Sequence, residues 1–153
     1  MATMIKQSKI VCYHDELQAA LTAALKVADK KAYGAIQFRA YPDDQELMIC
    51  ALNSVATFVG VVPTEMCDLV APRDSTFEVP LSEASILARF PIKTPPGNED
   101  VPKSGLLVTE SYVQVTDETG LGIGIRHARV RRNSDIELPG NPLRTVTTAR
   151  TAA

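Results

Sequence analysis

Residues 14–40, HDELQAALTAALKVADKKAYGAIQFRA, decide the fold because the spacing of their hydrophobic residues changes partway along. Over residues 14–32 the apolar side chains recur every three or four positions, which is typical of an amphipathic helix. Acidic residues in its first turn and lysines in its last suit the helix dipole, and Gly34 follows as a stop. Over Ala35–Tyr41 apolar and polar residues alternate, which is typical of a strand. The sequence therefore predicts a helix over residues 14–32 and a strand directly after it.

Further strands are predicted on both sides of this stretch. A short apolar run at residues 9–13 precedes the helix. Short turns separate two more strands, at Glu46–Leu52 and at residues 55–62, and Pro63 is expected to end the second of them. The order strand, helix, three strands therefore forms one unit that contains a three-stranded meander.

The same order of elements repeats once, roughly 68 residues further on, with Ser8 and Thr76 as equivalent starts. The second unit has a strand at residues 76–79, a helix at 81–90 with Ser82 as N-cap, and strands at 106–109, Tyr112–Thr116 and 122–131. Two such units predict an α+β domain in which both helices pack side by side on one face of antiparallel sheets.

Length and composition fit a single domain. The chain has 153 residues, of which 45% are hydrophobic and 22% charged, so it is large enough to bury a core. We expect that domain over residues 1–140, with a loose tail at 141–153. The longest apolar runs are too short to cross a membrane, and no secretory signal is expected at the start. Three cysteines without CxxC spacing indicate free thiols in a reducing compartment, so a cytoplasmic location is predicted.

Charge is divided unevenly along the chain. The formal net charge is −2, but residues 121–153 hold six arginines and only two acidic residues. Four of these arginines, Arg126, Arg129, Arg131 and Arg132, crowd onto the last predicted strand. They form either a solvated edge strand kept soluble by its charge, or a basic edge that binds an anion or a neighbouring subunit.

A second basic group lies on the predicted helices. Lys26 is nine residues from Leu17, about 180° around the helix, and therefore faces away from the core. Lys30 follows one turn later, and Arg89 takes the equivalent place on the second helix. Little acid interrupts this layer, so a mildly basic surface is predicted. The three side chains form either an ordinary solvated face or an anion-binding surface.

Residues that catalysis or metal binding would need do not occur in suitable groups. His14 is interpreted as a polar residue at the helix entrance, able to cap it or meet a phosphate, and His127 as an exposed strand histidine. Cys67 has no histidine near it in sequence, which disfavours a thiol nucleophile. The glycines at residues 120–124 enter a strand rather than a helix, which favours a hairpin over a phosphate-binding loop. We therefore predict a protein that is not an enzyme and has no metal or cofactor.

Four segments resemble a single domain of the DNA sliding clamp family, the processivity rings of replicative polymerases. The family is recognised by element order and apolar pattern rather than by catalytic motifs. The matching segments cover about residues 7–132 of the chain. They are residues 14–40, quoted above, ELMICALNSVATFVGVVPTE at 46–65, TFEVPLSEASILARF at 76–90 and GLLVTESYVQVTDETGLGIGI at 105–125.

The resemblance implies a mechanism. Clamp rings contain six such domains, whose helices line a hole through which duplex DNA passes, held by diffuse basic charge without base readout. It implies that Lys26, Lys30 and Arg89 contact DNA phosphates. A ring of this chain would be a homo-oligomer of six copies, in which the arginines of the last strand meet an acidic edge containing Asp68 and Asp74. A polymerase or another replication protein would be its tethered partner.

Two functions follow from these observations. The first is a clamp subunit that surrounds duplex DNA and tethers replication proteins. The second is a clamp-like adaptor or inhibitor that forms no ring and binds a host replication or transcription protein. A small chain of this kind is expected from a virus or plasmid, acting in the host cytoplasm.

Overall fold

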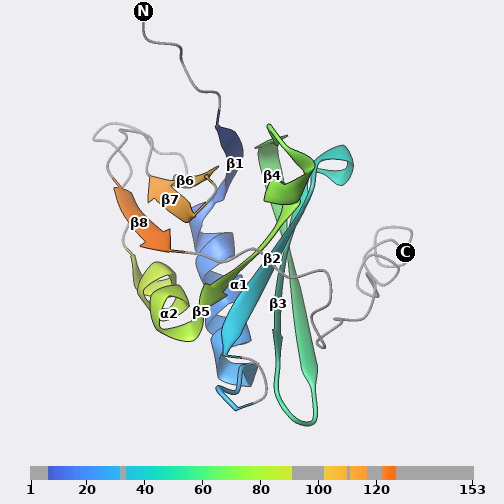
Figure 1. The fold of residues 1–153 in the computed structure, drawn as a ribbon, viewed down its shortest axis with the longest axis vertical. Coiled ribbons are helices and arrows are strands. Elements are labelled where there is room, and N and C mark those ends of the chain that lie inside the picture. Colours follow the sequence, from blue (N-terminus) through green and yellow to red (C-terminus); the bar gives the residue numbers. More distant parts are fainter. Residues whose placement is uncertain (1–6, 32–33, 91–101, 110, 117–121, 127–153) are drawn as a thin grey trace, which may run out of the picture.

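The structure, a computed structural model, describes residues 7–31, 34–90, 102–109, 111–116 and 122–126 (Figure 1). The first unit of the chain contains β1 (Ser8–Tyr13), α1 (His14–Val27), β2 (Ala35–Tyr41), the 3₁₀ helix η1 (Pro42–Asp44), β3 (Glu46–Leu52) and β4 (Thr57–Asp68). The second unit contains β5 (Thr76–Pro80), α2 (Leu81–Arg89), β6 (Lys103–Val108), β7 (Tyr112–Thr116) and β8 (Gly122–Arg126), after the 3₁₀ helix η2 (Pro72–Ser75).

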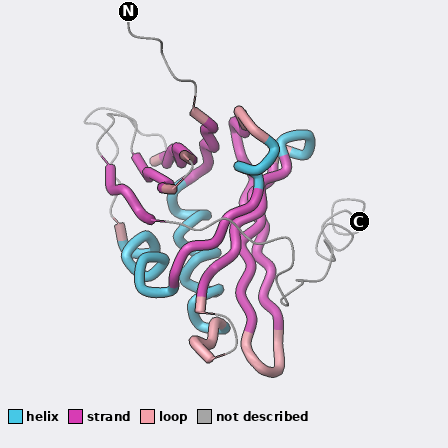
Figure 2. Tube along the Cα trace, in the orientation of Figure 1, coloured by secondary structure: helices cyan, strands magenta, loops and turns pink. Residues whose placement is uncertain are grey.

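The predicted repeat of strand, helix and three strands is confirmed, and so is the α+β class. The strands form one antiparallel sheet in the order β5-β2-β3-β4-β1-β6-β7-β8, so each unit contributes to the hydrogen bonding of the other. Figure 2 shows the two helices beside one another against the strands. In both units the helix begins at the residue after the first strand.

Strand β4 runs past the proline that was expected to end it. Its first half pairs with β3, from Thr57 opposite Leu52 to Pro63 opposite Glu46, and its second half pairs with β1. Pro63 sits where β4 changes partner and is exposed, so its missing N–H removes no bond from the middle of a ladder. The prediction of a strand over residues 55–62 was therefore wrong at both ends. One long strand joins the two halves of the sheet.

Helix α1 ends at Val27, not at residue 32 as predicted. Ala28 already has ψ 137°, an extended value, although its N–H still bonds to the carbonyl of Ala24. The β3–β4 hairpin supplies the reason, because the Asn53 side chain donates to the carbonyl of Val27 at 3.0 Å. The main-chain N–H of Asp29 then bonds to the carbonyl of Leu52. A contact distant in sequence therefore terminates the helix.

The ends of two other elements also differ from the prediction. Helix α2 is preceded by Pro80, and neither Ser82 nor any other side chain caps it by a hydrogen bond. The N–H of Leu81 bonds instead to the carbonyl of Gly34, at the start of β2. Strand β6 begins at Lys103, three residues before the predicted start, because the whole of β1 pairs with it.

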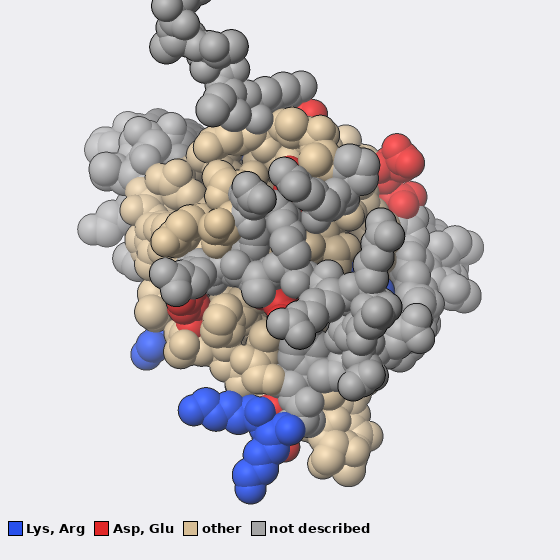
Figure 3. Space-filling view, in the orientation of Figure 1, with Lys and Arg blue, Asp and Glu red and all other residues tan. Residues whose placement is uncertain are grey.

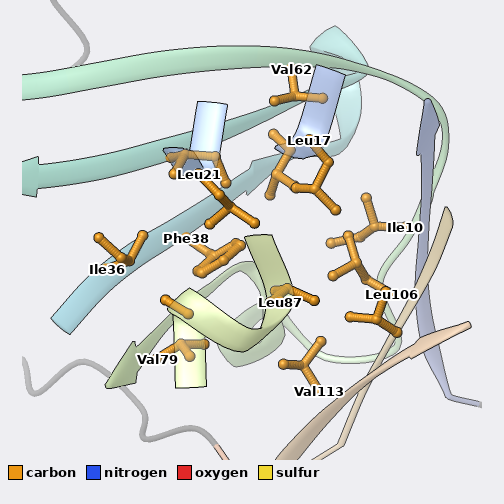
Figure 4. Packing of buried hydrophobic residues seen from close by; sticks show 14 of the residues in the cluster. Ile10, Leu17, Leu21, Ile36, Phe38, Val62, Val79, Leu87, Leu106 and Val113 are labelled. Atoms are coloured by element: carbon orange, nitrogen blue, oxygen red, sulfur yellow. The ribbon is translucent and has the colours of Figure 1, made fainter. Parts of the chain in front are cut away.

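The core lies between the helices and the sheet (Figure 4). Phe38 of the first unit and Phe77 of the second stack with their ring centroids 5.0 Å apart. Around them pack fully buried residues from both helices and both halves of the sheet, among them Ile10, Leu17, Leu21, Ile36, Leu87 and Leu106. Burying each such side chain contributes about 1.5–3 kcal/mol, so this shared core holds the two units together.

Candidate nucleic-acid interface

The two helices form a layer in which they run in opposite directions. The carbonyl of Phe90, just after α2, lies 2.6 Å from Nε2 of His14. It also accepts a hydrogen bond of 3.0 Å from Nε2 of Gln18. The end of α2 is therefore fixed beside the first turn of α1, and the end of α1 lies at the other end of the layer (Figure 1).

Lysines gather where α1 ends. Lys26 is exposed in the last turn of the helix. Lys30 and Lys31 are exposed as well, but they follow the helix, so Lys30 does not share a helical face with Lys26 as the sequence predicted. The main-chain N–H of Lys31 bonds to the Asp29 carboxylate, which shapes this connection. We call Lys26, Lys30 and Lys31 the α1-end lysines. Lys and Arg side chains project from the lower end of the molecule in Figure 3.

Arg89 occupies the last turn of α2 and is exposed. Its guanidinium is held along its own helix, because Nε donates to the carbonyl of Ser85 at 3.2 Å and Nη2 to its hydroxyl at 3.4 Å. These contacts engage two of the five N–H donors of the group. Arg89 can therefore present further donors to an anion while its position stays fixed.

The three predicted DNA contacts do not form one cluster. Gln18 marks the level at which α2 ends, and Lys26 lies eight residues further along α1. His14 contacts the same Phe90 carbonyl one turn earlier, so at a rise of about 1.5 Å per residue Lys26 and the end of α2 are separated by about 12–18 Å along the helix axis. The surface therefore has two basic points at opposite ends of the helical layer.

The helical layer is electrically neutral, so the prediction of a mildly basic surface was wrong. Its four basic side chains are the α1-end lysines and Arg89. Four acidic side chains balance them: Asp15, Glu16, Asp29 and Glu83. Three of these occupy the first turns of the two helices, where the helix dipole favours negative charge. Positive charge is therefore confined to the helix C-termini.

The residues predicted to join subunits are placed differently from one another. Arg126 lies at the end of β8, where it pairs with Tyr112. Strand β8 is one edge of the described sheet, and β5 is the other. Asp68 is exposed, but it lies on β4 in the interior of the sheet, opposite Lys9. Arg129, Arg131 and Arg132, like His127, lie outside the described residues.

Asp74 is not an edge residue. Only 7% of it is exposed, and its Oδ2 accepts a hydrogen bond of 2.5 Å from the hydroxyl of Ser8. The same hydroxyl accepts the main-chain N–H of Val70 at 2.8 Å. Asp74 therefore anchors the crossover between the two units within one chain, and the expected role in a subunit contact is not supported by its position.

The surroundings of His14 and Cys67 do not suit phosphate binding or nucleophilic chemistry. His14 is buried, so it does not offer itself to a phosphate, and burial lowers its pKa despite the nearby Phe90 carbonyl. Burial likewise raises the pKa of the Cys67 thiol, with the Asp68 carboxylate adding to the effect, which leaves little nucleophilic thiolate. Among the described residues, no three His, Cys, Asp or Glu side chains gather as metal ligands would. None of the described helices is long and apolar enough to cross a membrane.

Sequence reasoning missed two residues of this surface. Lys31 extends the basic group at the end of α1. Its position next to Lys30 in the sequence could have added it to the predicted phosphate contacts. Asn53 fixes where α1 ends, yet nothing in the local sequence links it to Val27, 26 residues earlier.

Comparison with solved structures shows a clamp-like fold. A DnaN sliding clamp (DNA polymerase III subunit beta) from Pseudomonas aeruginosa bound to griselimycin is similar, with TM-score 0.63, 13% identity, and coverage of 90% of this chain and 34% of that chain. A second structure of the subunit from the same organism matches with TM-score 0.61 and 14% identity, over 88% of this chain and 33% of that one. PCNA from Thermococcus kodakaraensis matches with TM-score 0.52 and 13% identity, over 86% of this chain and 50% of that one.

This chain therefore spans about a third of the length of the bacterial clamp chains and half of that of PCNA. At these identities the likeness concerns the fold alone. Neither the known protein-family models nor the curated protein sequences match the chain.

Proposed function

We propose that this protein is a clamp-like subunit that assembles around duplex DNA and holds replication proteins on it. The observation that carries the proposal is the fold, because nine-tenths of the chain superposes on a sliding clamp. The two helices form an exposed layer on one side of the sheet, which is the element that lines the hole in the family this sequence resembles. No catalytic group is needed for such a role.

The basic points at the two ends of the helical layer support phosphate contacts. They lie about 12–18 Å apart along the helix axis, a separation comparable with the width of about 12 Å of the major groove of B-DNA. Lys26 and Arg89 therefore fit contacts with phosphates on either side of a groove. Such contacts hold DNA without reading its sequence, and they allow it to slide.

Assembly is the second part of the proposal. Since the chain has about a third of the length of a bacterial clamp chain, a ring requires several copies, and six would supply the number of domains that the resemblance implies. The described sheet ends at β5 and β8. Contacts between these edges, with Arg126 at the end of β8, would join one copy to the next in a head-to-tail ring.

Two measurements test this function. Light scattering after size exclusion, over a range of protein concentrations, should give a mass near six chains. Retention on closed circular DNA should fall at least tenfold in the triple variant K26E/K30E/K31E and should decrease with salt. The matched control is K9E, because Lys9 is exposed on β1 but alternates with the core residue Ile10 and so faces away from the helices. A ring that loses no DNA in the triple variant would overturn the proposed DNA contact.

The neutral helical layer favours one alternative, an adaptor or inhibitor that keeps the clamp-like fold without encircling DNA. Four acidic residues offset four basic ones there, which weakens attraction to a polyanion. This alternative predicts a monomer or dimer at all concentrations, unchanged mass with DNA present, and a stoichiometric complex with a host replication or transcription protein.

A further inference from the structure

Exposed residues at spacings of three or four form one stripe along each helix, on the side that points away from the core. The stripe consists of Asp15, Ala19, Thr22 and Lys26 on α1 and of Ile86 and Arg89 on α2. We call the two stripes together the helix face. It is the surface of the helical layer that a second molecule would meet.

The middle of the helix face suits contact with another helical surface. Ile86 is 48% exposed, although it is a large apolar side chain. The exposed residues in the middle of the α1 stripe, Ala19 and Thr22, are small and uncharged. A second surface can therefore approach closely here and remove Ile86 from water, which favours association.

The ends of the helix face carry opposite charges. Asp15 is exposed at the start of α1, and its Oδ1 accepts the main-chain N–H of Glu16 at 2.8 Å. Lys26 is exposed eleven positions later, about 16 Å along the axis. No ion pair between described residues involves either side chain. Helix α2 repeats the pattern, with Glu83 in its first turn and Arg89 in its last. Each helix is therefore the electrostatic complement of a second copy of itself laid across it in the opposite direction.

A two-fold axis would create this arrangement for both helices if it passed each at the right level. Two antiparallel copies of α1 bring Asp15 opposite Lys26 when the axis passes midway between these residues. Two antiparallel copies of α2 bring Glu83 opposite Arg89 when the axis passes beside Ile86. One axis can serve both helices only if these two levels coincide.

The contacts of the Phe90 carbonyl show that the levels do coincide. This carbonyl lies 2.6 Å from Nε2 of His14 and accepts a bond of 3.0 Å from Nε2 of Gln18, so it is level with about the middle of residues 14–18. Helix α2 runs back along α1, which places Ile86, four residues earlier, about 6 Å further along and therefore level with about residue 20. The midpoint of the α1 stripe lies between residues 20 and 21.

We propose that a second copy of this chain docks on the helix face, related to the first by a two-fold axis that passes beside Ile86. Ile86 packs against Ile86 of the second copy, and Asp15 of each copy pairs with Lys26 of the other. The same surface serves on both copies, so this interface is isologous, unlike the head-to-tail contacts of a ring.

The size of the helix face predicts a weak dimer. Helix α1 has 14 residues and is about 21 Å long, and two helices side by side are about 20 Å wide. The resulting area of about 400 Å² is half of the roughly 800 Å² that each partner contributes to a stable interface. The dimer should therefore form only at high protein concentration.

The dimer covers the surface that a clamp ring would turn toward DNA. Lys26 cannot pair with Asp15 of a second copy and contact a phosphate at the same time, so duplex DNA and the dimer exclude one another. This consequence rests on the proposed function, whereas the dimer itself does not. The dimer would hold free chains with their DNA-facing surface closed.

A cysteine at the axis tests the dimer. In I86C the two introduced thiols should lie close together, so a short bismaleimide should join two chains into a covalent dimer. The control is V55C, because Val55 is 90% exposed but lies in the β3–β4 hairpin, away from the axis. The wild-type chain, with its three native cysteines, gives the background. A yield in I86C no higher than in V55C would overturn the proposal.

Exchanging charges tests the orientation of the two copies. D15K/I86C alone and K26D/I86C alone place like charges opposite one another at two symmetric points, so each should cross-link about tenfold less than I86C. In an equimolar mixture every Lys again meets an Asp, so the yield should recover and the product should contain one chain of each kind, as measured by mass spectrometry. A variant that had lost its fold could not recover in this way. No recovery in the mixture would overturn the two-fold arrangement.

Adding duplex DNA separates this inference from the proposed function. If both are correct, DNA should reduce the cross-linking of I86C. An unchanged yield would contradict the DNA contact and leave the dimer standing. Absence of the cross-link without DNA would overturn the dimer, while retention on circular DNA would still decide the clamp function.

Discussion

The first and second units share an order of elements but close differently. In the first unit, α1 has 14 residues, and β4 has 12 residues, enough to pair with β3 and then reach back to β1. In the second unit, α2 has nine residues, and the five described residues of β8 pair with β7. The described sheet is therefore continuous at the β1–β4 junction and ends at β5 and β8. Two units with the same topology therefore derive their stability from different contacts.

The largest loss of stability is expected when the aromatic contact that joins the two units is removed. Phe38 and Phe77 are both fully buried and stack across the β2–β5 pair. Replacing Phe38 by Ala should lower the free energy of unfolding by about 3–5 kcal/mol, because it removes apolar contacts and leaves a cavity. Denaturant titration of F38A, F77A and the double variant would measure this loss.

The double variant should cost less than the sum of the two single variants by about 0.5–1.5 kcal/mol, which is the energy of the aromatic pair beyond its buried area. The control is V55A, since Val55 is 90% exposed and its loss should change stability by less than about 0.5 kcal/mol. Strict additivity of F38A and F77A would show that the stack does not couple the units.

A smaller effect is expected at the helix ends, where the units differ most. Asn53 caps α1 through Val27, and its Oδ1 also accepts the N–H groups of Val55 and Ala56 at 2.8 Å. The variant N53A should lose about 1–2 kcal/mol, because these bonds lie in a partly solvated hairpin. Ser82 of α2 makes no cap bond, so S82A should lose less than about 0.5 kcal/mol.

Thermal unfolding and amide exchange would check this difference between the helices. In N53A, amide protection should fall in the last turn of α1 while that of α2 is retained. Equal losses in N53A and S82A would contradict the assignment of Asn53 as the group that ends α1.

The same contacts explain how far sequence reasoning reached. Periodicity over residues 14–40 predicted α1, β2 and the repeat correctly, because the spacing of apolar residues is a local property. It placed the end of α1 five residues too late, because that end depends on Asn53 in the distant hairpin. The sequence also predicted that Asp74 is a surface residue. Its hydrogen bond with Ser8, 66 residues away, leaves no local pattern that could have predicted its burial. Lys30 was then placed on a helix that had already ended.

The smallest expected effect is a pH dependence at the point where the two units meet. The His14 pKa lies below its usual 6.5 because burial disfavours the charged ring, an effect that the Phe90 carbonyl and Asp15 oppose. The folded state therefore holds its proton less tightly than the unfolded state does, so this contribution to stability is fully present above pH 6.5 and is lost as pH falls through the folded pKa. The variant H14Q keeps an amide donor for the Phe90 carbonyl but does not titrate. Between pH 7.5 and pH 5.5 the wild type should lose more stability than H14Q. Equal slopes in the wild type and H14Q would show that the neutral ring of His14 does not hold the end of α2 against α1.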